Sequence, residues 1–318
     1  MENCKSYVGI DVSKSYLDLQ IADSQIYRRY PNNSDGIHKL MDTIRGIGGE
    51  ITLLCEATGG YEKLLVQVSN NQEFKIIVIQ PRQIRSFAKA LNIHCKTDKI
   101  DANVLALFCK HFGHKLYAHK TYPLQEELRF LMRRRNELVE RKVEIGNRIE
   151  KLLKTDRILA SYEEEKAFVE KLIKNIDKDL KEYIKSNDTL KNQHELLQSI
   201  QGIGFKTAVE IIAELPEITE LSPSQLAALV GLAPINKDSG RYQGKRFIQG
   251  GRKQVRKALY MAAVTAIKYD STLKEFYQRL LTKGKPFKVA ITAVCRKMIL
   301  MAQVVLKRQT PWTAHVSA

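Results

Sequence analysis

The chain has 318 residues, 44% of them hydrophobic and 27% charged, which is typical of a globular protein with two or three domains. A mean hydropathy of -0.30, no apolar run of membrane-spanning length and no signal peptide predict a soluble, cytoplasmic protein. The formal net charge of +17 favours a nucleic-acid partner, and five cysteines without CxxC spacing argue against disulfides and a zinc site.

The first 115 residues predict an α/β domain. Apolar alternation indicates three early strands, after which helices and strands alternate and glycine or proline marks the turns. The strands are expected over 7–12, 16–21, 25–30, 51–55 and 74–79, and the helices over 34–47, 59–69, 82–91 and 98–112. This order of elements is that of a ribonuclease-H-like domain.

Four carboxylates in this domain predict a metal site. Asp11 lies in the first strand and Glu56 at the end of the fourth, while Asp98 and Asp101 stand three apart at the start of the last helix. Acids brought together repel one another unless a cation neutralises them, and Mg²⁺ prefers oxygen ligands. Singly, Asp98 could be a helix cap and Glu56 a loop residue; Asp18 is expected to face solvent, outside the set.

Residues 116–190 predict long, charged helices. A heptad of apolar residues favours a helical hairpin or coiled coil, although Arg135 and Lys142 interrupt its second seam position. A dimerisation arm or spacer and a bundle packed within one protomer both fit this pattern. The heptad positions are Leu124, Leu131, Leu138, Ile145, Leu152 and Leu159.

Residues 191–318 predict a helical domain that carries most of the excess charge. They have a net charge of +12, against +3 for 1–115 and +2 for 116–190. Residues 200–208 have the form of a helix-hairpin-helix, in which Gly202, Gly204 and Lys206 would present N–H groups and a cation to a phosphate. An ordinary helix turn with glycine caps is the alternative.

A glycine-rich basic stretch over 231–256 contains Ser239. Its cations could offset negative charge if Ser239 attacked a phosphodiester, but Asp-Ser-Gly is also an ordinary turn and no histidine nearby supplies a base. The basic residues expected to contact nucleic acid here are Lys237, Arg241, Lys245, Arg246, Arg252 and Arg256.

Several segments together resemble the DEDD transposases of bacterial insertion sequences, which are related to Piv-type DNA invertases. In the first domain these are GIDVSK at 9–14, CEATGGY at 55–61 and KTDKIDA at 96–102. In the last they are GIG at 202–204, GLAP at 231–234, SG at 239–240 and RKAL at 256–259. One departure is QGGR at 249–252, where relatives commonly carry Gly-Asn.

The resemblance implies a RuvC-like domain over 1–115, a coiled-coil arm over 116–190 and a helical transposase domain over 191–318. It implies a site-specific recombinase in which Asp11, Glu56, Asp98 and Asp101 hold Mg²⁺ and Ser239 forms a covalent link to the cleaved strand. It further implies a structured bridge RNA that pairs with donor and target DNA, and dimers or tetramers with composite sites. The alternative activity is that of a metal-dependent Holliday-junction resolvase in which water attacks.

Overall fold

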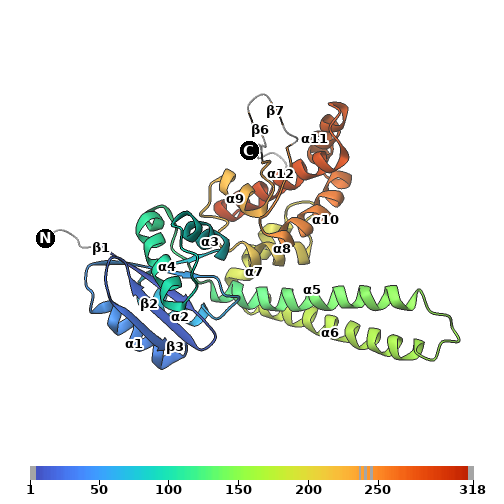
Figure 1. Cartoon of the computed structure of the whole chain (residues 1–318). Coiled ribbons are helices and arrows are strands. Elements are labelled where there is room, and N and C mark those ends of the chain that lie inside the picture. The colour runs from blue at the N-terminus through green and yellow to red at the C-terminus, as the bar shows by residue number, and fades with distance from the viewer. Residues whose placement is uncertain (1–4, 236–237, 240–241, 244–245, 314–318) are drawn as a thin grey trace. The chain divides into compact units, whose positions relative to one another are not determined.

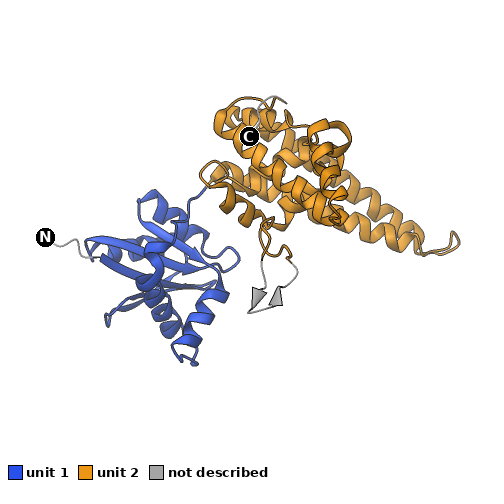
Figure 2. Ribbon diagram, turned by 90° about the horizontal axis from the view of Figure 1, so that it is seen from above, with its two compact units in different colours: residues 1–121 blue, residues 122–318 orange. Residues whose placement is uncertain are grey.

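The computed structural model describes residues 5–235, 238–239, 242–243 and 246–313 of the chain (Figure 1). The chain divides into two compact units, residues 1–121 and residues 122–318 (Figure 2). The first unit is α/β and the second is mostly helical, as the sequence predicts.

The described strands of the first unit form a five-stranded sheet in the order β3-β2-β1-β4-β5. β1 pairs antiparallel with β2, and β2 with β3, whereas β4 runs parallel to both β1 and β5. The expected elements are all present, with shifts of a few residues at their ends. They are β1 (Lys5–Val12), β2 (Tyr16–Ile21), β3 (Tyr27–Pro31), α1 (Ser34–Arg45), β4 (Glu50–Glu56), α2 (Lys63–Asn71), β5 (Lys75–Ile79), α3 (Pro81–Ala90), α4 (Asp98–Phe112) and a 3-10 turn at Gly113–Lys115.

Helices cover both faces of this sheet. Val8 and Ile10 of β1 belong to a buried cluster with residues of α1 and α2, whereas Leu54 of β4 packs with residues of α3 and α4. Because side chains alternate along a strand, Gly9 and Asp11 lie on the opposite face of β1 from Val8 and Ile10.

Gly9 allows α4 to cross β1 at close range. A Cβ atom added at Gly9 would lie 2.2 Å from the backbone nitrogen of Ala106 and 2.3 Å from the carbonyl oxygen of Ala102. No side chain fits in that space, so glycine at this position fixes how closely the helix approaches the strand.

The second unit begins with two long helices, α5 (Pro123–Ile149) and α6 (Leu159–Lys185), which pack side by side (Figure 1). The remaining helices surround a separate apolar core that the near ends of α5 and α6 complete. They are α7 (Asp188–Gln198), α8 (Phe205–Glu214), α9 (Pro223–Val230), α10 (Lys253–Tyr269), α11 (Ser271–Thr282) and α12 (Phe287–Arg308). Two short strands, β6 (Asp238–Ser239) and β7 (Tyr242–Gln243), lie between α9 and α10 in the chain.

Ion pairs explain the two basic residues that interrupt the heptad. Arg135 is buried on α5 and its Nε lies 2.5 Å from an oxygen of Asp177 on α6. Lys142 lies 2.9 Å from Glu170, also on α6. The seam between the helices therefore continues through cross-helix charge pairs where apolar residues are missing.

The expectation that no segment is long and apolar enough to span a membrane is wrong for α12. This helix has 22 residues and a window of mean hydropathy 1.8, but 61% of that window is buried inside the protein. Ile291, Val294 and Met298 are fully buried in the core of the second unit, so α12 has the character of a core helix.

Candidate functional site

Asp11 and Glu56 lie side by side at one edge of the sheet. β1 and β4 are parallel neighbours in which Ile10 is paired with Cys55, so the next residue of each strand is one of the two acids. Glu56 is the last residue of β4 and Asp11 the second-last of β1. The carboxyl ends of parallel strands thus bring these two carboxylates together, as expected for a site at a sheet edge.

The start of α4 adds the other two predicted acids. Asp98 and Asp101 occupy its first turn, which Thr97 caps through a 3.3 Å hydrogen bond that its Oγ1 accepts from the backbone N–H of Ile100. Asp98 is therefore not the N-cap residue.

The pKa values show that the acids interact. Burial raises the pKa of Asp11 to about 6, and neighbouring carboxylates push it in the same direction. Burial also raises the pKa of both Glu56 and Asp101. The neighbours that raise the pKa of Asp11 are, in decreasing order of influence, Asp101, Glu56, Asp98 and Asp18.

Two cations of the same unit counter part of this negative charge. Arg85 of α3 and Lys96, just before α4, both lower the pKa of Glu56 against the larger effect of burial. Lys96 acts in the same way on Asp101. Basic side chains therefore lie close to the acidic edge and could contact the phosphates of a bound strand.

Asp18 does not face solvent as the sequence analysis expected: it is 2% exposed. It lies directly opposite Asp11 in the β1–β2 register, on the face that α4 covers. Its Oδ1 accepts hydrogen bonds from the Tyr27 hydroxyl and, at 2.8 Å, from Arg29 Nε. The apolar residues on either side of Asp18 could have signalled that it points away from them, but the covering helix is not visible in a local pattern.

The carboxylates at this edge suit a divalent cation by their chemistry, but their side chains are not arranged around a single point. Within the described ranges, no three His, Cys, Asp or Glu side chains are arranged so that they could hold a metal ion. The acids nevertheless supply oxygen ligands only, and burial, together with the smaller effect of their mutual repulsion, raises the pKa of Asp11. The residue types therefore fit Mg²⁺, and metal binding would require their side chains to converge.

The backbone at Ser239 forms a small hairpin in the second unit. β6 and β7 pair antiparallel with Ser239 opposite Tyr242, and the backbone N–H of Ile235 donates to the carbonyl of Phe247 at 2.9 Å. The Ser239 side chain, and Lys237, Arg241 and Lys245, lie outside the described residues.

The predicted helix-hairpin-helix corresponds to α7, a short turn and α8. Gly202 has a φ of +92°, and a Cβ atom there would lie 2.6 Å from the carbonyl oxygen of Ala262 on α10, so packing requires glycine. Gly204 is the N-cap of α8 with open space beside it, and Lys206 lies 3.4 Å from Asp177. Phosphate binding by this turn remains a prediction.

Two of the residues predicted to contact nucleic acid, Arg252 and Arg256, instead make ion pairs or hydrogen bonds within the protein. The Arg252 guanidinium lies 2.5 Å from Glu217, and that of Arg256 donates to the carbonyls of Gly250 at 2.6 Å and Val230 at 3.1 Å. Arg246 is exposed. Arg252 and Arg256 therefore tie the glycine-rich stretch to the helices around it.

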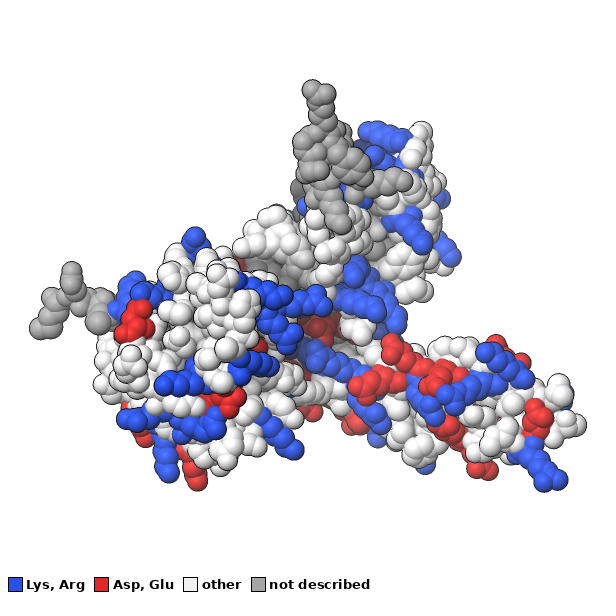
Figure 3. Space-filling view, in the orientation of Figure 1, with Lys and Arg blue, Asp and Glu red and all other residues white. Residues whose placement is uncertain are grey.

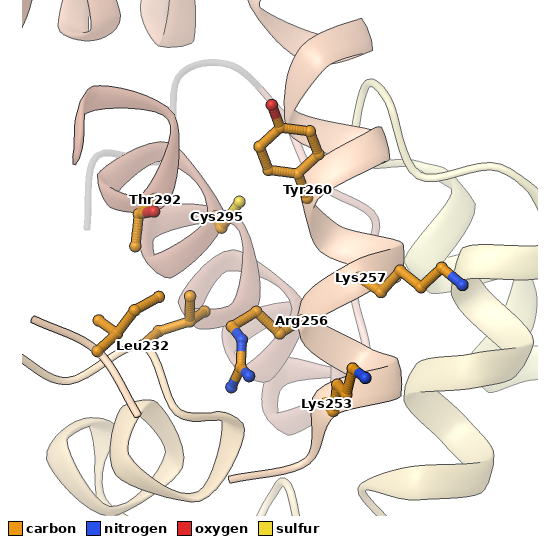
Figure 4. Close-up of a pocket in the computed structure, with 8 residues that line it drawn as sticks. Leu232, Lys253, Arg256, Lys257, Tyr260, Thr292 and Cys295 are labelled. Carbon is orange, nitrogen blue, oxygen red and sulfur yellow. The ribbon is translucent and has the colours of Figure 1, made fainter. Parts of the chain in front are cut away.

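A cavity of about 300 Å³ lies at the base of the segment that carries Ser239 (Figure 4). Leu232 and Ile248, on either side of that segment, both line it. Local sequence patterns do not reveal this cavity, because its walls come from segments far apart in the chain. The other lining residues are Lys253, Arg256, Lys257, Tyr260, Thr292 and Cys295.

Charge is distributed unevenly within the second unit. Acidic and basic side chains alternate along α5 and α6 on the face shown in Figure 3. Residues 246–313, by contrast, contain 15 lysines and arginines and only two acids, Asp270 and Glu275. Such a bias suits a surface that neutralises phosphates.

Comparisons with known proteins agree on one group. The DEDD transposase model of IS110 type, described as "Transposase", matches residues 8–156, and that of the "Transposase IS116/IS110/IS902 family" matches residues 194–278. The pilin gene-inverting proteins of Moraxella bovis and Moraxella lacunata are each 27% identical to the chain, over 98% of it and 99% of their own length. An uncharacterized 42 kDa protein of insertion element IS900 from Mycobacterium paratuberculosis is 31% identical over 36% of this chain and 29% of its own.

Proposed function

Because the chain belongs to the IS116/IS110/IS902 family of transposases, we propose that it is a DNA recombinase that excises and inserts an insertion sequence by serine attack on a phosphodiester. The observation that carries this proposal is that four acids, from two strands and one helix, lie near enough to one another at one edge of the sheet to interact electrostatically. The strongly basic segment that follows Ser239 supports DNA as the substrate.

Asp11, Glu56, Asp98 and Asp101 would hold Mg²⁺ at this edge. A bound Mg²⁺ would offset the negative charge of the scissile phosphate and orient its oxygens. Arg85 and Lys96 would hold the neighbouring phosphates, since both act electrostatically on the acids.

Ser239 would supply the nucleophile. Its Oγ forms a bond to phosphorus as the bond to the 3′ oxygen breaks; the serine hydroxyl loses its proton and the leaving 3′ oxygen gains one. The product is a phosphoserine link to the 5′ phosphate and a free 3′ hydroxyl. The bond energy is conserved in this link, so a second hydroxyl can displace the serine and rejoin the strands.

The covalent link gives the test. Labelled donor DNA incubated with wild-type protein and Mg²⁺ should give a protein–DNA band on a denaturing gel, and Ser239→Ala should abolish this band and recombination while DNA binding persists. Ser161→Ala, an exposed serine of α6, is the matched control and should keep both. Cleaved DNA without a covalent band in the wild type would instead support hydrolysis by water, the resolvase-type reaction.

Each composite site would combine the acids of one protomer with Ser239 of another, in a dimer or tetramer. Asp11→Asn and Ser239→Ala proteins are each expected to be inactive alone. A mixture of the two should recover part of the activity, because one of the two composite sites in a mixed dimer would be intact. No recovery in mixed oligomers, verified by two different affinity tags, would place both halves in one protomer.

A structured bridge RNA would select the donor and target sites. The basic surface over 246–313 is suited to hold RNA as well as DNA, since both present a phosphate backbone. A noncoding RNA from the DNA flanking the gene should co-purify with the protein and be required for recombination. Efficient recombination after complete ribonuclease treatment would contradict RNA guidance.

A further inference from the structure

Three charged residues lie in a row across the antiparallel half of the sheet. Asp11 of β1 is directly opposite Asp18 of β2, and Asp18 is directly opposite Arg29 of β3. Residues that are directly opposite in a sheet share a face, so all three lie on the α4 side. This row ends at the start of α4, where Asp98 lies.

Arg29 is held by Asp18. Its Nε and one terminal nitrogen donate to the two carboxylate oxygens of Asp18 at 2.8 and 3.2 Å, which is the bidentate geometry of a strong ion pair. The guanidinium also lies over the ring of Tyr16, 5.2 Å from its centroid. Asp18 is 2% exposed, so its partner cannot drift without leaving a buried charge unpaired.

From this fixed position Arg29 reaches the acidic site. The terminal nitrogen that contacts Asp18 also donates to Oδ2 of Asp98. The Asp98 side chain is 59% exposed and would otherwise rotate freely at the start of its helix. The bond to Arg29 selects one orientation and occupies only one of its two carboxylate oxygens.

We propose that the ion pair between buried Asp18 and the more exposed Arg29 positions Asp98 for metal binding. In this arrangement Asp18 holds Arg29 and Arg29 holds Oδ2 of Asp98, so Oδ1 is the oxygen that would bind the ion. Groups that orient a metal ligand in this way commonly change metal affinity about 10- to 100-fold when they are removed. This inference rests on the proposed role of the four acids as metal ligands.

Removing Arg29 alone would mix two effects, because the loss of its positive charge would attract the cation while the loss of its hydrogen bond would disorder Asp98. The double variant Asp18→Asn/Arg29→Gln removes one charge of each sign, so the net charge of the site is unchanged. It also avoids a buried unpaired carboxylate and should fold. A change in metal affinity then reports on the orientation of Asp98.

The experiment is a Mn²⁺ titration of the full chain, followed by isothermal calorimetry and by the shift in melting temperature. The double variant should bind Mn²⁺ at least about tenfold more weakly than the wild type. The single variant Arg29→Lys keeps the positive charge and one hydrogen-bond donor. It should bind Mn²⁺ more tightly than the double variant but more weakly than the wild type. Tyr27→Phe is the matched control: it removes a hydrogen bond to Asp18 but none to Asp98, and should leave the affinity unchanged.

Two outcomes are separable. If the wild type binds Mn²⁺ and the double variant binds it equally well, the positioning role is wrong while the metal role of the acids stands. If the wild type binds no divalent ion, both with and without DNA, the metal role itself fails and the positioning role falls with it.

Discussion

The acidic edge is expected to destabilise the protein when no metal is bound. Burial and the neighbouring carboxylates raise the pKa of Asp11 from 3.8 to about 6, a difference of about two units. Each unit corresponds to about 1.4 kcal/mol, which gives about 3 kcal/mol. Asp11 is only partly buried, so solvent screening reduces this to about 1–2 kcal/mol.

Asp11→Asn should therefore stabilise the metal-free protein by about 1–2 kcal/mol at pH 7.5. The folded state holds the Asp11 proton more tightly than the unfolded state does, so wild-type stability falls as the pH rises from about 4 to 6. The destabilisation is complete above pH 6. At pH 4 the carboxyl is protonated when folded, and the difference between the two proteins should nearly vanish.

Urea denaturation in EDTA measures the effect, and hydrogen exchange of the β1 amides reports on the first unit alone. Adding Mg²⁺ should stabilise the wild type more than the variant, because the cation offsets the repulsion. Asp23→Asn is the control: Asp23 is exposed and pairs with Lys110 away from the four acids, so it should give no stabilisation. An Asn variant no more stable than the wild type at pH 7.5 in EDTA would refute this account of the acidic edge.

Other predictions concern packing, ion pairs and DNA. Gly9→Ala should cost about 3 kcal/mol in urea denaturation because α4 must move away, whereas Gly146→Ala, with open space in α5, should gain about 0.5–1 kcal/mol. Asp177→Ala should lower the free energy of unfolding by about 3 kcal/mol, since buried Arg135 loses its partner. If the ion pair is net favourable, the double variant Asp177→Ala/Arg135→Met should also be less stable than the wild type. A cost of Asp177→Ala below about 0.5 kcal/mol would contradict the burial argument. Arg85→Ala should weaken DNA binding at all sequences and reduce the slope of log affinity against log salt by about one, and an unchanged slope would exclude a phosphate contact.

The sequence predicted the first unit well because its strands and helices have clear periods. Alternation and turn residues locate β1 and β4, and they place Asp11 and Glu56 near the ends of those strands. Asp18 was mispredicted because alternation shows only that it points away from Leu17 and Leu19. Whether that second face meets water or a helix depends on α4, some 80 residues later in the chain.

The second unit shows a similar limit. The heptad predicts α5 and α6, but Arg135 reads as a break in the seam until Asp177 is known to lie opposite it. Gly202 fits a phosphate-binding turn in the sequence, whereas its close contact is with α10, about 60 residues away. Local patterns specify helices and turns; they do not specify which distant segment a residue meets.

The crossing of α4 over Gly9 has a consequence for how the protein is made. Asp11 and Glu56 emerge early during synthesis, but Asp98 and Asp101 join them only after the helix has docked against the strand. A ribosome-bound fragment, or a chain cut before residue 98, has only half of the carboxylates. The acidic edge is therefore complete only after the first unit has been synthesised through α4 and has folded.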